Sequence, residues 1–516
     1  MNFFEKRHLY LLILIITSST NPLKGDAFDD SIDEATTNLI EPTGPKVKKI
    51  KHSSSIDILL QLLTGNIDQI LARNFYQKTF TPLKRPVTTL PIFNLYHTDH
   101  ICQNWLFNMN FFFDKTDRAF YTFNSPYIET LVDVDPDTLR QIEQLAAKAP
   151  QILGLFRRAK KEERRLGVNL EYLKNFYEYL SLELKTAFLY EERNVFLTPE
   201  EIEEVKKLFP GGEKQQEKEF QKHVIADKIG FDDLKVKLGC LVLEKDNLCI
   251  KVGAQSTIPT AFAFKKGILG SNFLKIAEKS DPQFSFFTIF DLLDKNDTTA
   301  LTEYTKNFGF EVVDRLSGIA FDSQMGNDGH FGLGCFIEPK IKVNEGVTLR
   351  TLASVEYFFP AKEKRYFLRI KNPADFPTFA DTKNEQLATA AVNFLDQQVV
   401  ETFFPPLFTT YVTPGFIAQF TIGPKFRLRE WDFAFGYDFY YQHKEKINYI
   451  QGNSTNLYVS KGARSKAFQN TIFASIFYNN VKPDSDWSLL FNFEEALYSK
   501  GVGNNYTLSL CFESNY

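Results

Sequence analysis

The chain has 516 residues, with 60 Lys or Arg against 64 Asp or Glu, and its formal net charge is −4. This balance argues against a nucleic-acid partner, and the length suits one large domain or two ordinary ones. Phe is abundant at 52 residues, which indicates either an aromatic-rich surface or an AT-rich coding sequence. A mean hydropathy of −0.25 is typical of a water-soluble chain, yet strands that alternate apolar and polar residues give the same average.

The first 20 residues have the features of a secretory signal peptide. Lys6 and Arg7 precede a short apolar run at 9–16, and small polar residues follow at 17–20. The run is too short to cross a bilayer, which takes about 20 apolar residues. We therefore assign residues 1–20 to a signal peptide, with an uncleaved anchor as the alternative. No later segment has a long uncharged apolar stretch, which disfavours a helical membrane protein.

Residues 21–100 form a polar N-terminal segment with one predicted amphipathic helix. The segment is acidic and polar to about Pro45, a composition typical of disordered chain. Ser54–Arg73 then carries apolar residues at helical spacing, although Gly65 weakens that prediction. This helix is a separate short helix, lies on a membrane surface, or folds back into the rest of the protein.

From residue 101 to residue 516 the dominant pattern is a period of two, which predicts β-strands. It is clearest in residues 430–442, where six aromatic residues share one face and charged or small residues share the other. A soluble sheet rarely places six aromatics on one face, whereas a lipid-facing strand does so. Similar alternation occurs in residues 105–113, 234–242, 248–255, 331–342, 347–359, 416–422, 487–497 and 506–516, and more weakly in 468–478.

One segment, residues 135–222, departs from this period and is predicted to be a helical insert. Asp135 followed by Pro136 is typical of a helix start. Apolar residues from Leu170 to Leu180 recur at helical spacing. Thr198 and Glu201 form a capping box, which predicts a further helix beginning there.

The last strand is the most specific signal in the chain. It reads YTLSLCFESNY from Tyr506 to Tyr516, with apolar residues on one face, polar residues on the other and an aromatic at the last position. This segment resembles the closing strand of bacterial outer-membrane β-barrels, as a broad class. The resemblance implies an all-β fold: a transmembrane antiparallel up-and-down β-barrel of about 10–12 strands with an α-helical insert, spanning residues 101–516.

The same resemblance implies a place and partners. The protein is expected in the outer membrane of a Gram-negative-type bacterium, in contact with outer-membrane lipid. Tyr516 is expected to be the signal read by the barrel-assembly machinery. No nucleic-acid partner is expected, and the sequence leaves a homo-oligomer open.

Connection lengths are consistent with such a barrel. Tight turns alternate with long connections at 262–329, 360–410 and 443–465, and outer-membrane barrels have short periplasmic turns and long external loops. With both chain ends in the periplasm, the insert 135–222 lies outside the cell; one miscounted strand would place it in the periplasm. Two more strands are allowed at 263–273 and 308–321. The segment 54–73 or the connection 262–329 is able to fold into the barrel.

We find no motif for a cofactor, a metal or a known catalytic class. The five cysteines, at positions 102, 240, 249, 335 and 511, have no metal-ligand spacing and are interpreted mostly as small strand residues. Two Asp–His pairs, Asp328 with His330 and Asp438 with His443, fall near the outer rim. Strand parity points His330 inward and His443 outward, so we assign no catalytic residue.

The inward-facing charges are the candidate site. They form one basic and one acidic wall, an arrangement that orients a small polar solute, although charges also fill narrow barrels to neutralise one another. The predicted pore-lining residues are Lys235, Lys237, Lys251, Glu338, Lys340, Lys342, Arg350, Glu356, Glu430, Asp432, Asp438, Glu494 and Glu513. The sequence predicts a narrow channel or transporter for small polar solutes. The alternative is a structural or surface-interaction barrel whose extracellular helical insert binds a partner, and an outer-membrane hydrolase is a distant third.

Overall fold

The computed structural model describes residues 85–90, 105–119, 160–176, 179–196, 199–207, 209, 211–279, 284–295, 297–321, 325–367, 389, 393, 396–397, 400, 404–452, 457, 459–482 and 485–515. All of them belong to one compact unit, Asp57–Tyr516. The predicted signal peptide, the helix at 54–73, the helix start at Asp135 and the terminal Tyr516 lie outside these residues.

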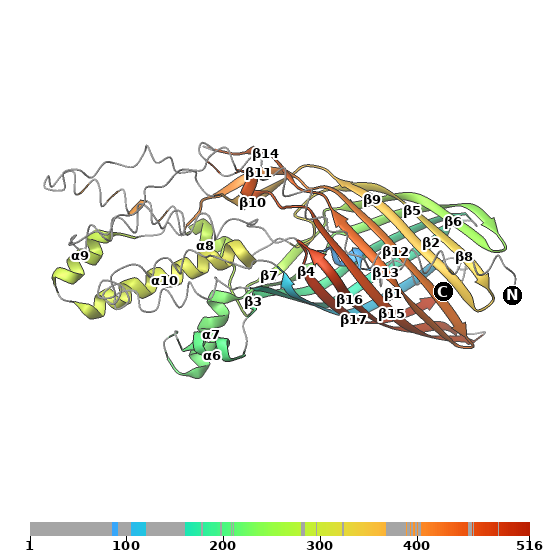
Figure 1. Ribbon diagram of the computed structural model, residues 1–516, viewed down its shortest axis with the longest axis horizontal. Helices are drawn as coiled ribbons and strands as arrows, with labels where there is room; N and C mark the ends of the chain where they lie inside the picture. Colours follow the sequence, from blue (N-terminus) through green and yellow to red (C-terminus); the bar gives the residue numbers. More distant parts are fainter. Residues whose placement is uncertain are drawn as a thin grey trace, which may run out of the picture. The chain divides into compact units, whose positions relative to one another are not determined.

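Alternating apolar and polar residues build a closed antiparallel β-barrel of twelve strands (Figure 1). Each strand pairs with its neighbours in chain order, and β17 pairs with β1 from Leu106 opposite Asn515 to Asp117 opposite Asn504, which closes the ring. The predicted range of 10–12 strands is confirmed. The barrel strands are β1 (Trp105–Ala119), β2 (Lys160–Phe176), β3 (Leu180–Phe196), β5 (Leu234–Lys245), β6 (Leu248–Ile258), β8 (Gly332–Asn344), β9 (Val347–Phe358), β12 (Gly415–Leu428), β13 (Trp431–Gln442), β15 (Ala467–Lys482), β16 (Ser485–Lys500) and β17 (Asn504–Asn515).

Five further strands lie outside this ring. Strand β4 (Ala226–Phe231) pairs with the second half of β3, and β7 (Phe262–Lys266) pairs with β4. A separate small sheet contains β10 (Ala361–Tyr366), β11 (Leu407–Thr413) and β14 (Lys446–Ile450).

The described helices lie in the connections between strands and before the barrel. They are η3 (Val87–Thr89), α6 (Pro199–Lys206), α7 (Glu213–Val224), α8 (Phe273–Lys279), α9 (Phe286–Asp294), α10 (Thr298–Phe321) and α12 (Val459–Gly462). Helices α7, α8 and α10 share an apolar core that includes Phe220, Phe273 and Val312. Among the described residues, no helix is both long enough and apolar enough to cross a membrane.

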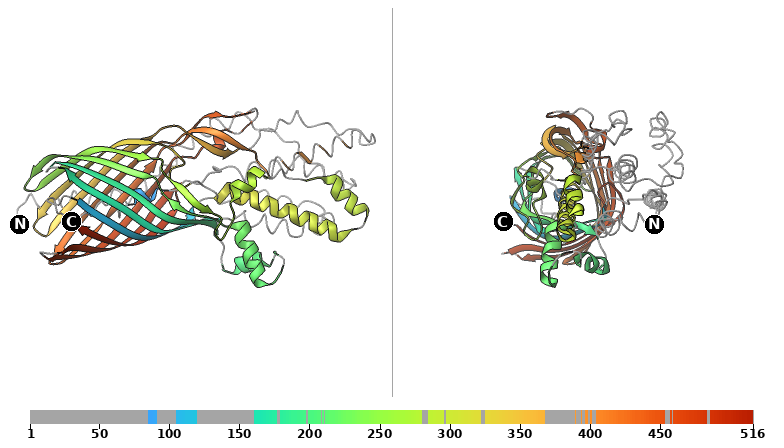
Figure 2. Two further views of the ribbon diagram at one scale, coloured as in Figure 1. Left: turned by 180° about the vertical axis from the view of Figure 1, so that it is seen from behind. Right: turned by 90° about the vertical axis from the view of Figure 1, so that its left-hand side faces the viewer.

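The two ends of the barrel differ. At one end, here called the terminal end, β1 begins, β17 finishes, and the hairpins β2–β3, β5–β6, β8–β9, β12–β13 and β15–β16 make short turns. At the opposite end, here called the cap end, the connections carry helices α6 to α10 and the small sheet (Figures 1 and 2). Short turns therefore alternate with long connections, as predicted, except that β16 and β17 are joined tightly at the cap end.

The prediction of a continuous helical insert at 135–222 is wrong over residues 160–196. These residues form the hairpin β2–β3, whose strands pair from Lys160 opposite Phe196 to Phe176 opposite Leu180. The apolar residues of β2 also fit a period of two, and in the barrel this period places Arg165 and Glu171 inside. Within the described residues of this segment, helix occurs after this hairpin, where α6 begins at Pro199 beside the predicted capping box.

The two extra strands allowed by the sequence are also corrected. Residues 308–321 belong to α10 and not to a strand. Of the segment 263–273, only the part within β7 is a strand, it lies outside the ring, and Phe273 begins α8. Both segments are apolar and short, a condition under which strand and buried helix have the same signature.

The outer face of the barrel is apolar and is bordered by aromatic residues. Near the terminal end, the rings of Trp431, Tyr478, Trp487 and Phe512 form a chain of contacts with centroids 5.0–6.2 Å apart. Near the cap end, Tyr441 contacts Phe416 at 5.6 Å. From Trp431 to Tyr441, at about 3.3 Å per residue and a tilt of about 40°, the rise is roughly 25 Å, which matches the lipid-facing band of membrane barrels.

Candidate functional site

The inner face of the barrel is filled largely by ion pairs. On β1 to β3, Arg165 Nη2 lies 2.7 Å from Asp114 Oδ2, and Lys185 Nζ lies 2.6 Å from Glu183 and 2.9 Å from Glu171. All five side chains are at most a few per cent exposed. Burial of a charge is costly unless a partner lies close, so this wall is internally neutralised.

The adjoining wall, from β5 to β9, follows the same rule with longer contacts. Lys235 Nζ lies 3.6 Å from Glu356, and Lys237 Nζ lies 3.4 Å from Glu183 and 3.8 Å from Glu338. Basic residues of β5 thus face acids from β3, β8 and β9. The predicted split into a basic and an acidic wall is therefore weakened, because most buried bases have an acid from a neighbouring strand.

An apolar cluster also lies on the inner face, which the sequence analysis did not predict. It joins residues of β8, β9, β13, β15, β16 and β17, namely Phe336, Leu352, Ala434, Phe473, Phe477, Leu490 and Cys511. The ring of Phe473 lies so close to the backbone of β13 that a Cβ on Gly436 would be 2.3 Å from Cζ. Glycine is needed there because another side chain approaches the strand. The inner face of β15 mixes Phe473 and Phe477 with polar side chains such as Gln469, which explains its weak alternation.

A short N-terminal segment, Arg85–Leu90, occupies the lumen in its cap-end half. Arg85 Nη2 forms an ion pair of 2.5 Å with Asp438 on β13, and Nη1 donates to Gln469 Oε1 on β15 at 3.0 Å. The guanidinium also lies over the ring of Tyr440, 5.0 Å from its centroid. Arg85 is 3% exposed and Asp438 is fully buried. One wall therefore holds this segment through a charged side chain.

The other wall holds the backbone of the same segment. Arg165 on β2 donates from Nη1 to the carbonyl of Arg85 at 2.6 Å. Val87 and Leu90 pack in an apolar cluster with Phe112 on β1 and Leu189 on β3. Gln419 on β12 donates to the carbonyl of Thr89 at 2.7 Å. The segment thus reaches from β12, β13 and β15 across to β1, β2 and β3, and it fills the lumen between them.

The structure places most of the predicted pore-lining residues on the inner face. Seven of them are buried there: Lys235, Lys237, Glu356, Asp432, Asp438, Glu494 and Glu513. Lys251, Glu338, Lys340 and Arg350 are half-buried toward the terminal end. Two assignments are corrected, because Lys342 is exposed near the β8–β9 turn and Glu430 is exposed in the turn between β12 and β13.

Sequence reasoning missed the inner residues of β2 and β3 and the whole of Arg85–Leu90. The former, which include Arg165, Glu171 and Lys185, were hidden by the helical assignment, although Leu180, Leu182 and Leu184 on β3 show the period of two. Arg85 stands in a stretch without periodicity, and no pattern in the sequence pairs it with Asp438.

A ring of alternating charges lies at the cap end and joins three of the connections between barrel strands, β6–β8, β9–β12 and β13–β15. Asp328, Arg464, Glu445, Arg365, Glu363 and His330 follow one another as partners. The separations along this sequence are 2.5 Å from Arg464 to Asp328, 3.1 Å from Arg464 to Glu445, 3.1 Å from Arg365 to Glu445, 2.6 Å from Arg365 to Glu363, and 2.7 Å from His330 to Glu363. All six are buried. Three carboxylates face two guanidiniums, so a protonated His330 makes the charge ring neutral.

The pKa values in this charge ring move in the directions that neutrality requires. Burial by itself lowers the pKa of His330, but the hydrogen bond to Glu363 and its charge outweigh burial and raise that pKa above 6.5. Burial by itself raises the pKa of Glu363. The charge of Arg365 and the hydrogen bond from His330 outweigh burial and lower that pKa below 4.5. The hydrogen bond and charge of Glu363 therefore favour the protonated form of His330.

The two predicted Asp–His pairs do not form dyads. Nδ1 of His330 lies 2.9 Å from the carbonyl of Phe359 and Nε2 lies against Glu363, while Asp328 binds Arg464. Asp438 is taken by Arg85, Gln419 and Thr421. His443 is exposed and stacks on Phe416. Neither Asp orients its histidine as a general base.

A closed antiparallel ring, an apolar outer band bordered by aromatics and a charged interior together define a transmembrane β-barrel. Its fold is that of the bacterial outer-membrane β-barrels, the broad class that the last strand resembles.

Several solved barrel structures resemble this chain at low sequence identity. They include an outer membrane channel from Pseudomonas putida F1 (8% identity, TM-score 0.39, 80% of this chain and 96% of that chain). A Pseudomonas aeruginosa FadL homologue has 7% identity and a TM-score of 0.31, with 85% and 99% covered. The translocator domain of the autotransporter NalP from Neisseria meningitidis has 6% identity and a TM-score of 0.31, with 81% and 90% covered. No family model and no curated protein matches the chain. Such values describe a likeness between barrels and carry nothing about substrate.

Proposed function

We propose that this protein is a narrow gated channel or transporter of the outer membrane, closed in this structure by Arg85–Leu90. One observation carries the proposal: a segment from outside the ring of strands lies inside it and is bound to opposite walls. A barrel that serves only as an anchor is filled by its own strand side chains. A separate segment held by one ion pair, a few hydrogen bonds and apolar packing, with no strand pairing to the barrel, is an arrangement that can open.

The proposed location follows from the outer surface. Phe435, Phe491 and Leu510 are 55%, 50% and 45% exposed and lie in the middle of the outer band. A continuous apolar belt of this kind is a liability in water and is matched to lipid. We infer that outer-membrane lipid is its direct partner. Recognition of Tyr516 by the assembly machinery and a homo-oligomer remain predictions.

The proposed substrate is a small polar solute. Lys251, Glu338, Lys340 and Arg350 are half-buried on the inner face toward the terminal end, where water reaches charged side chains. The apolar cluster around Phe473 lies beside them and narrows the polar path. The solute that fits best is one that exchanges hydration for these charged groups while passing an aromatic wall.

Conductance in planar bilayers tests the proposal. The wild-type barrel is expected to show rare openings, the variant Arg85→Gln frequent openings, and a variant without residues 85–90 a steady conductance. Arg427→Gln is the matched control, because Arg427 is half-exposed and pairs with Asp432 near the β12–β13 turn. A folded barrel without residues 85–90 that stays silent would refute the channel.

The second candidate is a surface-interaction barrel. Exposed apolar side chains on the cap-end connections favour it, namely Ile268, Leu269 and Phe287. If the deletion of residues 85–90 gives no conductance in a folded barrel, this alternative is the better account, and the cap-end helices become the part to test.

A further inference from the structure

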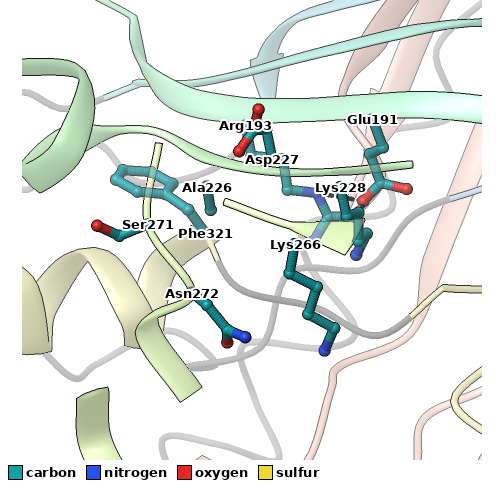
Figure 3. Close-up of a pocket in the computed structure, with 9 residues that line it drawn as sticks. All are labelled: Glu191, Arg193, Ala226, Asp227, Lys228, Lys266, Ser271, Asn272 and Phe321. Atoms are coloured by element: carbon teal, nitrogen blue, oxygen red, sulfur yellow. Dashed lines mark ion pairs between the residues drawn. The ribbon is translucent and has the colours of Figure 1, made fainter. Parts of the chain in front are cut away.

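A small cavity lies at the cap end of β3, outside the lumen site described above (Figure 3). Its wall comes from β3 and β4 on one side and from the β7–α8 connection and the end of α10 on the other. The cavity volume, measured as the space open to the centre of a water molecule, is about 10 Å³. This is room for one small molecule or ion. The lining that matters here is polar: Arg193, Lys228, Lys266, Asn272, Glu191 and Asp227.

Arg193 lines this cavity with hydrogen-bond donors that lack an acceptor. Its side chain is 1% exposed. Its Nε lies 2.9 Å from Glu163 and 3.1 Å from Glu191. Within the part of the chain that the structure describes, its Nη1 and Nη2 have no hydrogen-bond acceptor. A guanidinium keeps its charge at every accessible pH and always presents these donors, so an acceptor is missing from the cavity.

The charges around the cavity favour an anion over a water molecule. Three cationic side chains line it against two carboxylates. Glu191 is engaged by Lys228 at 3.2 Å as well as by Arg193. Asp227 is engaged by the loop, because its oxygens accept from the backbone N–H groups of residues 268, 269 and 270 at 2.8, 2.8 and 3.2 Å. The lining therefore has a cationic excess, and its two carboxylates already have other donors.

We propose that this cavity binds a small inorganic anion of about the size of chloride. The anion accepts hydrogen bonds from Nη1 and Nη2 of Arg193 and is held by the charge of Lys266, with Asn272 beside it. Arg193 belongs to the barrel wall, whereas Lys266 and Asn272 belong to the strand and loop that lead into α8. The bound anion thus ties the cap-end helices to the rim of the barrel.

The experiment uses the purified full-length barrel in detergent and measures its thermal unfolding midpoint. Sodium chloride replaces sodium gluconate at constant ionic strength. The midpoint is expected to rise with chloride and to saturate. Lys266→Gln, at a half-buried position, is expected to raise the half-saturating chloride concentration about tenfold, the size expected for one charged partner. Lys265→Gln, at the exposed neighbouring position, should leave the titration unchanged.

Two further observations decide the outcome. Crystals soaked in bromide should show an anomalous peak within hydrogen-bond distance of Arg193 Nη1 and Nη2 in wild-type protein and none in Lys266→Gln. Equal midpoints in chloride and gluconate, or equal titrations of the two lysine variants, would overturn the proposal. The variant Arg193→Gln is a secondary test, because it also removes the ion pairs of Arg193 with Glu163 and Glu191. Channel activity does not enter any of these readouts.

Discussion

Arg85 and Asp438 stand 353 positions apart in the sequence and form an ion pair of 2.5 Å inside the barrel. The pair joins a segment that precedes every barrel strand to the wall near the middle of the sheet. Asp438 also accepts from Gln419 at 3.1 Å and from Thr421 at 2.6 Å. Two side chains of the neighbouring strand β12 therefore orient the carboxylate, and Arg85 supplies the cation that it binds.

The first prediction concerns this pair. Arg85→Gln or Asp438→Asn alone should release the segment, because each leaves a buried partner without its counter-charge, at a cost of about 3–5 kcal/mol. The double variant should lose less than the sum, since neither unpaired charge remains. Hydrogen exchange of the peptide that contains residues 85–90 measures the release. Additive effects would show that the two residues do not act as a pair.

The second prediction concerns the outer face. Phe435 is 55% exposed in the middle of the apolar band, and Phe435→Arg should lower the free energy of unfolding in liposomes by about 2–4 kcal/mol. Leu428, at the β12–β13 turn, is 65% exposed, and Leu428→Arg should cost about 0–1 kcal/mol. Denaturant titration of both variants is the measurement. Equal losses would mean that this face does not contact lipid.

The third prediction concerns pH and the cap-end charge ring. The pKa of His330 is raised in the folded state, so its contribution to stability is complete below the unfolded value of about 6.5 and is lost as pH rises through the raised value. The pKa of Glu363 is lowered, so its contribution is present above about 4.5 and is lost as pH falls through the lowered value. The protection factor for hydrogen exchange in β10, which divides out the intrinsic rise of exchange with pH, should therefore be highest between these limits and should fall as the medium becomes alkaline.

Substitution identifies the group responsible for that alkaline limb. His330→Gln should remove it, because glutamine has no titratable proton in place of the imidazolium that faces Glu363. His443→Gln should leave it unchanged, since His443 is exposed. An alkaline limb that persists in His330→Gln would assign the pH dependence to another group.

The fourth prediction concerns closure of the ring. Deletion of residues 512–516 removes the partners of Met109 and Asn108 on β1. Unpaired backbone groups in lipid cost several kcal/mol each, so the truncated chain should be exported without assembling. Loss of the mobility difference between boiled and unboiled samples on a gel would report this failure. Tyr516→Ala keeps these pairings and separates the role of the terminal aromatic from strand pairing.

The period of two was sufficient to predict the barrel, its strand number within a narrow range and the alternation of short turns with long connections. It succeeded because one face of each strand contacts lipid, and few polar residues interrupt the apolar residues on that face. Phe433 and Phe435 on β13 are examples. It failed in β2, where Arg165 and Glu171 on the inner face made the segment look like a charged helix. Local spacing in such a segment fits both structures, and only pairing with β1 and β3 selects the strand.

The candidate site was predictable only in part. Inward charges such as Lys235 and Asp438 follow from strand parity once the barrel is assumed. Their partners do not, because Lys185, Glu183 and Arg85 come from segments without a strand signal in the sequence or with a misleading one. The apolar cluster around Phe473 also gives no signal, since a ring inside the barrel and a ring against lipid look alike in sequence.

The segment inside the lumen is tethered. Residues 91–104 join Leu90 to Trp105, where the first strand begins at the terminal end. In the proposed opening, the segment leaves its binding site but stays attached to the same molecule, so its return is a unimolecular step. A short tether of this kind keeps a group at an effective concentration on the order of millimolar. A solute that occupies the site of Arg85 therefore competes with that local concentration, and the closing rate is independent of how many barrels the membrane holds.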